Sequence, residues 1–221
     1  MHRIDCEDAL EQAFVQLKAL DPELIGMMHD RAGPPPLRQR APGFAGMVAI
    51  IVSQQVSVAS ARSIFARVSA RFDPLEASAI ADASEADLRQ CGLSSPKIKC
   101  LRALCDAILH DKLDLATLGD MEADAAHDRL TQIKGIGPWT AHIFLLFCLG
   151  HPDAWPSGDL ALQEGVRMAL DLPERPNAKA LEVISQRWHP WRGVAARLVW
   201  AYYGAVKSGT EFAAMAQAPD N

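Results

Sequence analysis

Apolar residues recur three and four positions apart in almost every segment of the chain, which places them on one face of an α-helix. The clearest stripes begin at Phe44, Ala61, Leu101 and Ala196. A further segment from Pro138 is apolar almost all round, which is typical of a buried helix. No segment alternates apolar and polar residues between hairpin turns. The sequence therefore predicts an all-α fold.

Local signals refine three of these helices. The stripe from Phe44 is predicted to continue onto Gln55, four residues after Ile51, so that the helix ends in a polar tip. Ser95 is predicted to cap the helix that contains Leu101, with Pro96 in its first turn. Cys105 falls on the apolar stripe of that helix, so we assign it to the core.

Composition limits the class of protein. The chain has 221 residues, of which 49% are hydrophobic and 22% charged, as in globular domains. A net charge of −5 excludes a surface that is basic throughout, but it allows a local basic patch. The five cysteines are odd in number and form no C-x-x-C pair, which indicates reduced thiols. With a polar start and no apolar run of membrane length, we expect a cytoplasmic protein, nucleoid-associated in a bacterium or nuclear in a eukaryote.

Glycine and proline mark where the chain changes direction. The segment 150–158 contains Pro152, Pro156 and Gly158 and is the best candidate for a crossing between two helical lobes. We expect one lobe over 43–152, and a second lobe built from 1–42 and 153–221. The first helix is expected to pack against the C-terminal helices.

The segment 130–141 predicts a helical hairpin that binds phosphate, within about 127–148. A tight turn over Gly135-Ile136-Gly137 needs glycine for a positive φ or a close backbone approach. Pro138 then begins a new helix, whose first amides, with those of Gly137 and Thr140, point outward at the positive end of the helix dipole. Lys134 adds a cation. The alternative is an ordinary helix–turn–helix corner with a glycine C-cap.

Several motifs in order resemble a known family. The hairpin is followed by the loop and aspartate of 155–162, and the chain also carries Ser53-Gln54-Gln55-Val56-Ser57. The remaining matches are Gly92-Leu93-Ser94 with Lys97 and Lys99, and Trp188-His189-Pro190-Trp191-Arg192 leading to Trp200. Over roughly 44–203 the chain resembles the DNA-3-methyladenine glycosylase II family of the helix-hairpin-helix DNA glycosylases. The resemblance implies a two-lobed helical fold, without the N-terminal β-rich domain of some members because only about forty residues precede Phe44.

The resemblance also implies a catalytic site. Asp159 corresponds to the family's catalytic carboxylate, which stabilises an oxocarbenium-like sugar. Trp139 and Trp200 would form walls of a base pocket between the lobes. Ile143 and Leu160 stand where the family often has further aromatic residues. The alternatives are an ordinary helix N-cap for Asp159 and core positions for the tryptophans.

DNA contacts follow from the same resemblance. Gln55 matches the residue that fills the gap left by a flipped base, and Gln54 is its neighbour; the alternative is a pair of solvated glutamines at a helix end. Lys134, Gly135, Gly137 and Thr140 would contact the DNA backbone through the hairpin. Basic residues near the motifs are further candidates for phosphate contacts, although each is more often part of a solvated face: Lys97, Lys99, Arg102, Arg187, Arg192 and Arg197.

Cofactor expectations come from the family too. The main-chain carbonyls of Thr131, Ile133 and Ile136 match those that hold Na⁺ or K⁺ in some hairpins. No cysteine follows Cys148, so we expect no iron–sulfur cluster. Trp139 stands where lyase-type members have a Schiff-base lysine, so we expect hydrolysis without lyase activity.

The leading hypothesis is a monomeric, monofunctional glycosylase that removes alkylated purines (3-methyladenine and 7-methylguanine) from double-stranded DNA during base excision repair. The helix following the turn and the glutamine tip would support base flipping. Two alternatives remain open: a non-catalytic helix-hairpin-helix DNA-binding module, and a lyase-type glycosylase for other lesions.

Overall fold

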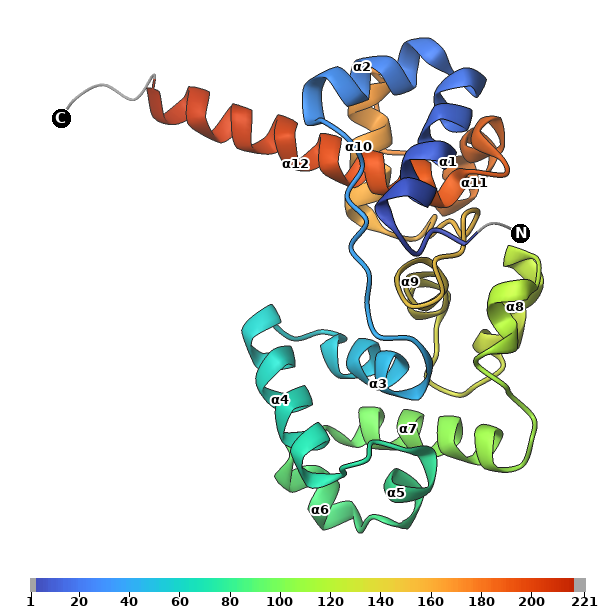
Figure 1. Ribbon diagram of the computed structural model, residues 1–221. Helices are drawn as coiled ribbons and strands as arrows, with labels where there is room; N and C mark the ends of the chain where they lie inside the picture. The colour runs from blue at the N-terminus through green and yellow to red at the C-terminus, as the bar shows by residue number, and fades with distance from the viewer. Residues whose placement is uncertain (1–2, 217–221) are drawn as a thin grey trace, which may run out of the picture. The chain divides into compact units, whose positions relative to one another are not determined.

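The computed structural model describes residues 3–216, with side chains as far as residue 209. Over this range the chain forms twelve α-helices and two short 3₁₀ helices, and the described backbone contains no strand (Figure 1). The predicted all-α fold is confirmed. Among the described residues, no helix combines the length and the apolar composition needed to cross a membrane.

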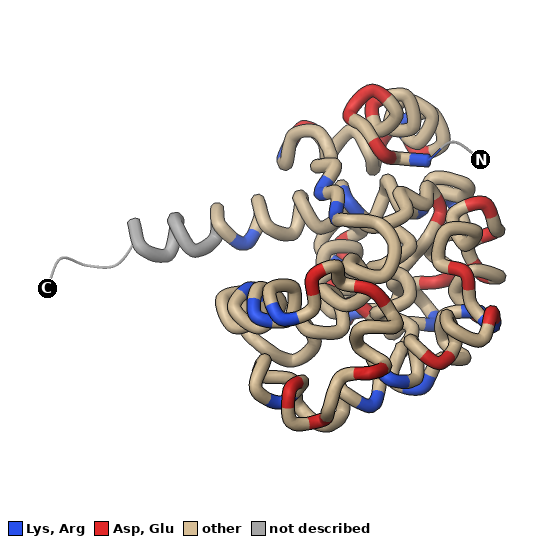
Figure 2. The backbone as a smooth tube through the Cα atoms, turned by 60° about the horizontal axis from the view of Figure 1, so that its bottom comes forward, with Lys and Arg blue, Asp and Glu red and all other residues tan. Residues whose placement is uncertain are grey.

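The chain divides into two compact units. One unit is Gln39–His151; the other joins the residues up to Arg38 to those from Pro152 onward. Acidic and basic residues are interspersed along the backbone, with no long block of one sign (Figure 2).

The unit Gln39–His151 contains seven α-helices. They are α3 (Gly43–Ser53), α4 (Val58–Arg71), α5 (Ala77–Asp82), α6 (Glu85–Gln90), α7 (Ser95–Leu109), α8 (Ala123–Thr131) and α9 (Pro138–Phe147), with a 3₁₀ helix at Thr117–Asp120. Helices α3 and α9 are the most apolar, and they pack against each other with most of their residues buried. The apolar stripes of Phe44 and Pro138 thus form the core of this unit.

The other unit contains α1 (Glu7–Leu20), α2 (Pro22–Ala32), α10 (Leu160–Ala169), α11 (Ala178–Ser185) and α12 (Arg192–Ala216), with a 3₁₀ helix at Gln186–Trp188. The first forty residues therefore hold two helices, where the sequence suggested one. Trp155 and Trp188 are buried here, with ring centroids 5.5 Å apart. The indole N–H of Trp188 donates to Asp21 Oδ2 at 3.1 Å, so the junction of α1 and α2 is fixed to the core.

Helix α7 begins one residue earlier than predicted. Ser94 is its N-cap, so Ser95 is already helical and Pro96 follows it in the first turn.

Cys105 is buried as expected, and burial raises the pKa of its thiol to about 11. The same desolvation raises the pKa of Cys100 to about 11 and that of Cys148 to about 12, so all three thiols stay neutral at physiological pH.

Candidate active site and DNA-binding hairpin

Asp159 is the N-cap of α10, and two donors orient its carboxylate. Oδ1 accepts the backbone N–H of Leu162 at 2.9 Å and the indole N–H of Trp200, on α12, at 3.0 Å. Asp159 is half-buried, as is Trp200. The N-cap interpretation is therefore confirmed, and it is compatible with the predicted catalytic role, because the cap hydrogen bond also holds the carboxylate in place.

The loop before Asp159 is rigid for reasons that are mostly local. The N–H of Asp159 donates to the carbonyl of Pro156 at 2.9 Å, which closes a turn. The side-chain amide of Gln163 donates to the carbonyl of Ser157 at 2.9 Å. Gln163 is buried on α10, four residues after Asp159. Gln163 is not among the predicted site residues. The sequence signal that points to it is a polar side chain on the face of α10 that packs inward.

Gly165 brings α10 close enough to α12 for the contact between Asp159 and Trp200. A Cβ atom at Gly165 would stand 2.6 Å from Cγ1 of Val199 and 3.1 Å from its carbonyl oxygen. Any larger residue would push the two helices apart. Because Trp200 follows Val199 directly, the close crossing places its indole beside the start of α10.

In the other unit, the predicted hairpin joins α8 to α9. Helix α8 ends at Thr131, with Gln132 as its C-cap, and α9 begins at Pro138. Gly135 has φ +96°, and a Cβ there would stand 2.7 Å from Cβ of Cys100 on α7. Gly135 therefore seats the turn against the protein, and it needs glycine for both its backbone conformation and its packing.

Gly137 is different, although it lies only two residues away. Its φ of −86° and ψ of 171° are open to any residue, and no described atom lies within 4 Å of the position its Cβ would take. As the N-cap of α9 it offers no side chain to the first amides, and the first helical hydrogen bond runs from Ala141 N–H to its carbonyl at 3.0 Å. The start of α9 therefore offers an accessible, positively polarised site for an anion.

Gln54 and Gln55, hereafter the tip, leave the helix where the sequence had predicted that it continues. Helix α3 ends at Ser53, Gln54 is its C-cap, and Gln55 has φ +55°. The interpretation of Gln55 as part of the helical stripe is therefore wrong. Gln54 is half-buried, and its Nε2 donates to the hydroxyl of Thr140, on α9, at 2.9 Å, while Gln55 is exposed. The left-handed conformation of Gln55 is rare outside glycine and asparagine, and such strain clusters at functional positions.

The remaining predicted site residues are divided between the two units. Trp139 is 38% exposed on the first turn of α9, and Lys134 is exposed in the turn. Ile143 is buried one turn further along α9. In the other unit, Leu160 is 62% exposed at the start of α10. Their assignment to a base pocket or to DNA contacts stays a prediction.

Four of the six basic residues suggested as phosphate contacts instead bind groups within the protein. Arg192 and Arg197 are buried: Arg192 pairs with Asp153 at 2.7 Å, and Arg197 donates to the carbonyls of Pro36 and Leu37. Arg102 donates to the carbonyl of Ile80 at 2.9 Å and to those of Ala81 and Ala83. Lys97 is buried too, with Nζ 2.7 Å from the carbonyl of Val52. For these four residues the predicted phosphate role is wrong, because backbone carbonyls or buried carboxylates already hold their donors.

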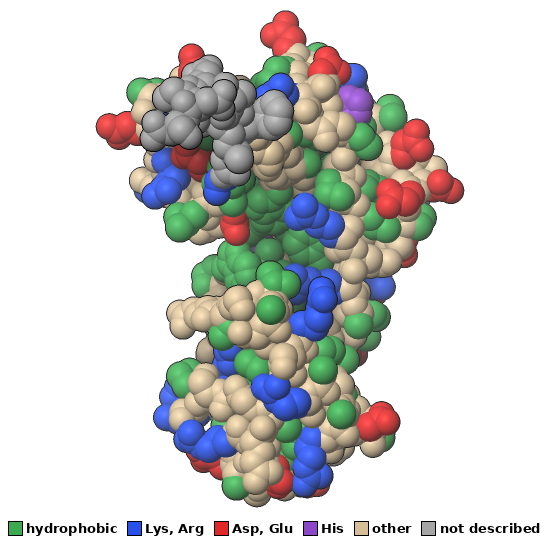
Figure 3. Space-filling view, turned by 90° about the vertical axis from the view of Figure 1, so that its left-hand side faces the viewer, with side chains coloured by type: hydrophobic (Ala, Val, Ile, Leu, Met, Phe, Trp, Pro, Cys, Tyr) green, Lys and Arg blue, Asp and Glu red, His purple; other side chains and the backbone are tan. Residues whose placement is uncertain are grey.

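Other basic side chains are exposed and remain candidates for phosphate contacts. Lys99 is exposed on α7, and Arg187 pairs with Asp21 at 3.5 Å while staying half-exposed. Helix α4 carries Arg62, Arg67 and Arg71 and no acidic residue. All three are exposed, although Arg67 donates to the carbonyl of Cys91 and Arg71 pairs with Asp87, each at 2.9 Å. On the part of Figure 3 formed by Gln39–His151, the visible charged side chains are mainly basic. Such a surface suits a polyanion even though the chain as a whole is acidic.

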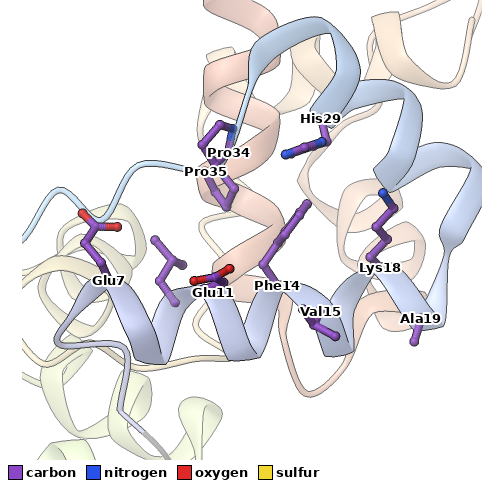
Figure 4. Close-up of a pocket in the computed structure, with 10 residues that line it drawn as sticks. Glu7, Glu11, Phe14, Val15, Lys18, Ala19, His29, Pro34 and Pro35 are labelled. Carbon is purple, nitrogen blue, oxygen red and sulfur yellow. The ribbon is translucent and has the colours of Figure 1, made fainter.

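A well-formed groove lies apart from all these residues. It has a volume of about 690 Å³ and lies between α1, α2 and the Pro34-Pro35 segment (Figure 4). Phe14 and His29 meet there with ring centroids 5.0 Å apart. None of the predicted site residues lines it. Among the described residues, no group of three or more His, Cys, Asp or Glu side chains forms a metal site.

Residues 48–190 match the sequence pattern of the HhH-GPD superfamily of base excision DNA repair proteins. The chain belongs to this superfamily. The predicted helix-hairpin-helix, formed by α8 and α9, is confirmed. Both the hairpin and Asp159 lie within the matched range.

Individual relatives agree with this assignment. A DNA-3-methyladenine glycosylase of Schizosaccharomyces pombe is 27% identical over 201 residues, which cover 87% of each chain. The crystal structure of a DNA-3-methyladenine glycosidase from Bacillus halodurans has a TM-score of 0.80 and 31% identity, over 93% of each chain. A 3-methyladenine DNA glycosylase of S. pombe in complex with abasic DNA has a TM-score of 0.71 and 26% identity, over 86% of this chain and 95% of that one. Two other curated relatives are longer, and the chain spans 42% and 40% of their length.

Proposed function

We propose that this chain is a monomeric, monofunctional DNA glycosylase that hydrolyses the N-glycosidic bond of alkylated purines, such as 3-methyladenine and 7-methylguanine, in duplex DNA. The observation that carries the proposal is the carboxylate of Asp159, oriented by Leu162 and Trp200. Related proteins named as 3-methyladenine glycosylases support the substrate class.

Asp159 supplies the electrostatic part of the reaction. When the C1′–N bond breaks, its electron pair leaves with the base and positive charge develops on the sugar. A carboxylate that two hydrogen bonds already hold in place stabilises this charge without reorganising. Water then adds to C1′, and its proton passes to Asp159 or to solvent. The hydroxyl group from water takes the place of the base at C1′, and no covalent enzyme intermediate forms.

The substrate explains why one carboxylate suffices. Alkylation of a purine ring nitrogen gives the base a formal positive charge, so it leaves without prior protonation. Electron-rich aromatic faces recognise such a base, and each cation–π contact contributes about 0.5–2 kcal/mol. We assign this role to Trp139 and Trp200, with Ile143 and Leu160 as further lining residues. Because Trp139 stands at the position of the lyase-type lysine, we expect no Schiff base.

The hairpin and the tip would prepare the substrate. Extruding a base from the stack costs a few kcal/mol. The amides at the start of α9, with Gly137 giving close access and Lys134 adding charge, would hold the DNA backbone. The exposed Gln55 would fill the gap, held by the contact between Gln54 and Thr140. Gly135 is exposed in the same turn, where its backbone would contact the DNA, and the side on which a Cβ would stand faces Cys100.

We also propose that the carbonyls of Thr131, Ile133 and Ile136 hold Na⁺ or K⁺. The donor set fits a hard cation, because all three are oxygens. The carbonyl of Thr131 ends α8, and that of Ile133 accepts only the N–H of Ile136, at 3.0 Å, among backbone donors. A bound cation would add positive charge beside the phosphate site. Affinity for undamaged duplex should fall when tetramethylammonium replaces K⁺ at constant ionic strength, and equal affinity in both salts would contradict the site.

Base release from methylated DNA tests the central proposal. The wild-type protein should liberate free 3-methyladenine, and Asp159→Asn should slow the release by about 100-fold, as for loss of one electrostatic stabiliser. The variant should still bind a duplex with an abasic-site analogue within a few-fold of wild type, because asparagine also caps helices. Glu174→Gln, in an exposed loop, is the matched control and should behave like wild type.

The alternatives give different results. If the wild-type protein binds duplex DNA but releases no free base, the chain is a non-catalytic DNA-binding module. If borohydride traps a covalent adduct with damaged DNA, the chain is a lyase-type glycosylase.

A further inference from the structure

Lys97 is a buried cation that the proposed mechanism does not use. It lies in the first turn of α7 and is 8% exposed, and its Nζ donates to the carbonyl of Val52 at 2.7 Å. Burial lowers the pKa of Lys97 below its ordinary value. Placing an ammonium group inside a protein is unfavourable unless polar partners compensate, so its position requires an explanation.

The partner of Lys97 identifies its role. Val52 is the second-to-last residue of α3, where the carbonyl oxygens have no N–H donor within the helix and lie at the negative end of the helix dipole. The ammonium group therefore fixes the place where α3 ends. The tip begins two residues later, with Gln54 as C-cap and Gln55 at φ +55°.

The tip is thus held from two sides within its own unit. Lys97 connects the last turn of α3 to α7, and the amide of Gln54 connects the tip to Thr140 on α9. Both attachments lie just before Gln55 in the chain, and Gln55 itself is exposed. Fixed points next to a strained residue are the arrangement that holds a side chain ready for contact without contacting the ligand themselves.

We propose, on the basis of the function proposed above, that Lys97 is a positioning residue for base displacement. It holds the last turn of α3 so that Gln55 enters the duplex where the damaged base leaves. Lys97 does not touch the reacting atoms, and its contribution is confined to substrates in which Gln55 must replace a base between intact neighbours.

Two duplexes separate positioning from general stability. Both contain one 7-methylguanine; in the first it is paired with cytosine, and in the second the opposite nucleotide is an abasic-site analogue, so that no base pair has to be opened. Lys97→Met should slow base release from the paired duplex by at least tenfold and from the second duplex by less than threefold. Lys97→Arg, which keeps the charge and the donors, should restore part of the loss. Lys112→Met, at an exposed lysine just beyond the C-terminal end of the same helix, should leave both rates unchanged.

Equal slowing on the two duplexes would overturn the proposal, because a merely structural lysine affects both alike. A second comparison holds even where Lys97→Met folds poorly. Lys97→Arg should slow release from the paired duplex in the wild-type background and have no further effect when Gln55→Ala is already present, and an equal effect in both backgrounds would again overturn it. If the wild-type protein releases base from neither duplex, the proposed function itself fails, which is a distinct result.

Discussion

Helices α9 and α10 begin in opposite ways. Helix α9 starts behind Gly137, which has no side chain to offer, and its first amides lie at the surface of the hairpin. Helix α10 starts behind Asp159, whose carboxylate accepts the N–H of Leu162. Both N-caps have an extended backbone, so the difference comes from the side chain alone.

This difference separates two uses of the same helix end. An N-terminus has unpaired N–H groups and a partial positive charge. Without a side-chain cap, this end is suited to an external anion such as a phosphate. With an aspartate cap, the end instead immobilises a negative charge, which Trp200 then orients further. In the proposed function, the first position would hold a DNA phosphate and the second would stabilise a cationic sugar, although both N-caps have an extended backbone.

The largest effect we expect concerns the two glycines of the hairpin. Gly135→Ala should destabilise the protein by about 2–3 kcal/mol, since it combines strain at φ +96° with a contact against Cys100. Gly137→Ala should leave the unfolding free energy almost unchanged and weaken binding to undamaged duplex. Chemical denaturation and fluorescence anisotropy measure the two quantities. Comparable destabilisation by both variants would contradict the assignment of Gly137 to the ligand.

Gly137→Asp converts the start of α9 into the type found in α10. The new carboxylate should cap the helix and raise the unfolding free energy by a few tenths of a kcal/mol. It should also repel phosphate and weaken duplex binding by at least tenfold, or about 1.4 kcal/mol. Gly137→Asn adds a cap without the charge and is the matched control. If the aspartate and asparagine variants bind DNA equally, charge does not decide the difference between the two helix ends.

Trp200→Phe tests the second hydrogen bond to Asp159. The ring face is kept and only the indole N–H is lost, so base release should slow by about tenfold, as for a hydrogen bond to a charged group. The effect should disappear when Asp159→Asn is already present, because Trp200 acts through the carboxylate. A further tenfold loss in the double variant would show an independent role for the indole.

The smallest effect we expect distinguishes the capping role of the Asp159 side chain from the role of its charge. Asp159→Ala should lower the unfolding free energy by about 1 kcal/mol, whereas Asp159→Asn should leave it nearly unchanged. Both variants should lose base release to a similar extent. Equal stability of the two variants would mean that the cap at α10 contributes nothing to the fold.

Features that depend on neighbouring residues could be predicted from the sequence. The all-α fold, the turn at Gly135 and the position of Asp159 before a helix follow from short-range spacing and turn chemistry. The contact between Asp159 and Trp200 joins residues 41 positions apart and depends on the close crossing at Gly165. A single sequence contains no signal for such a distance; only the family resemblance suggested both residues.

Long side chains explain the main errors. Lysine and arginine are usually exposed, so Lys97, Arg192 and Arg197 were interpreted as surface cations. Whether an internal carbonyl or carboxylate receives such a group depends on tertiary packing that spacing does not reveal. The prediction that α3 continues onto Gln55 is wrong for a related reason. Periodicity extends the helix to Gln55, whereas the contacts of Lys97 and Gln54 end it at Ser53.

One of the two units is assembled from both flanks of the sequence, and this has a consequence for biosynthesis. Helices α1 and α2 leave the ribosome before all of Gln39–His151, yet α12, against which both pack, comes afterwards. Arg197 reaches the carbonyl of Leu37 across a sequence separation of 160 residues. Until translation reaches α12, the apolar faces of the first two helices have no lasting cover, so nascent chains should depend on chaperones at this stage, and substitutions in α12 should lower cellular yield more than equally buried substitutions in α3.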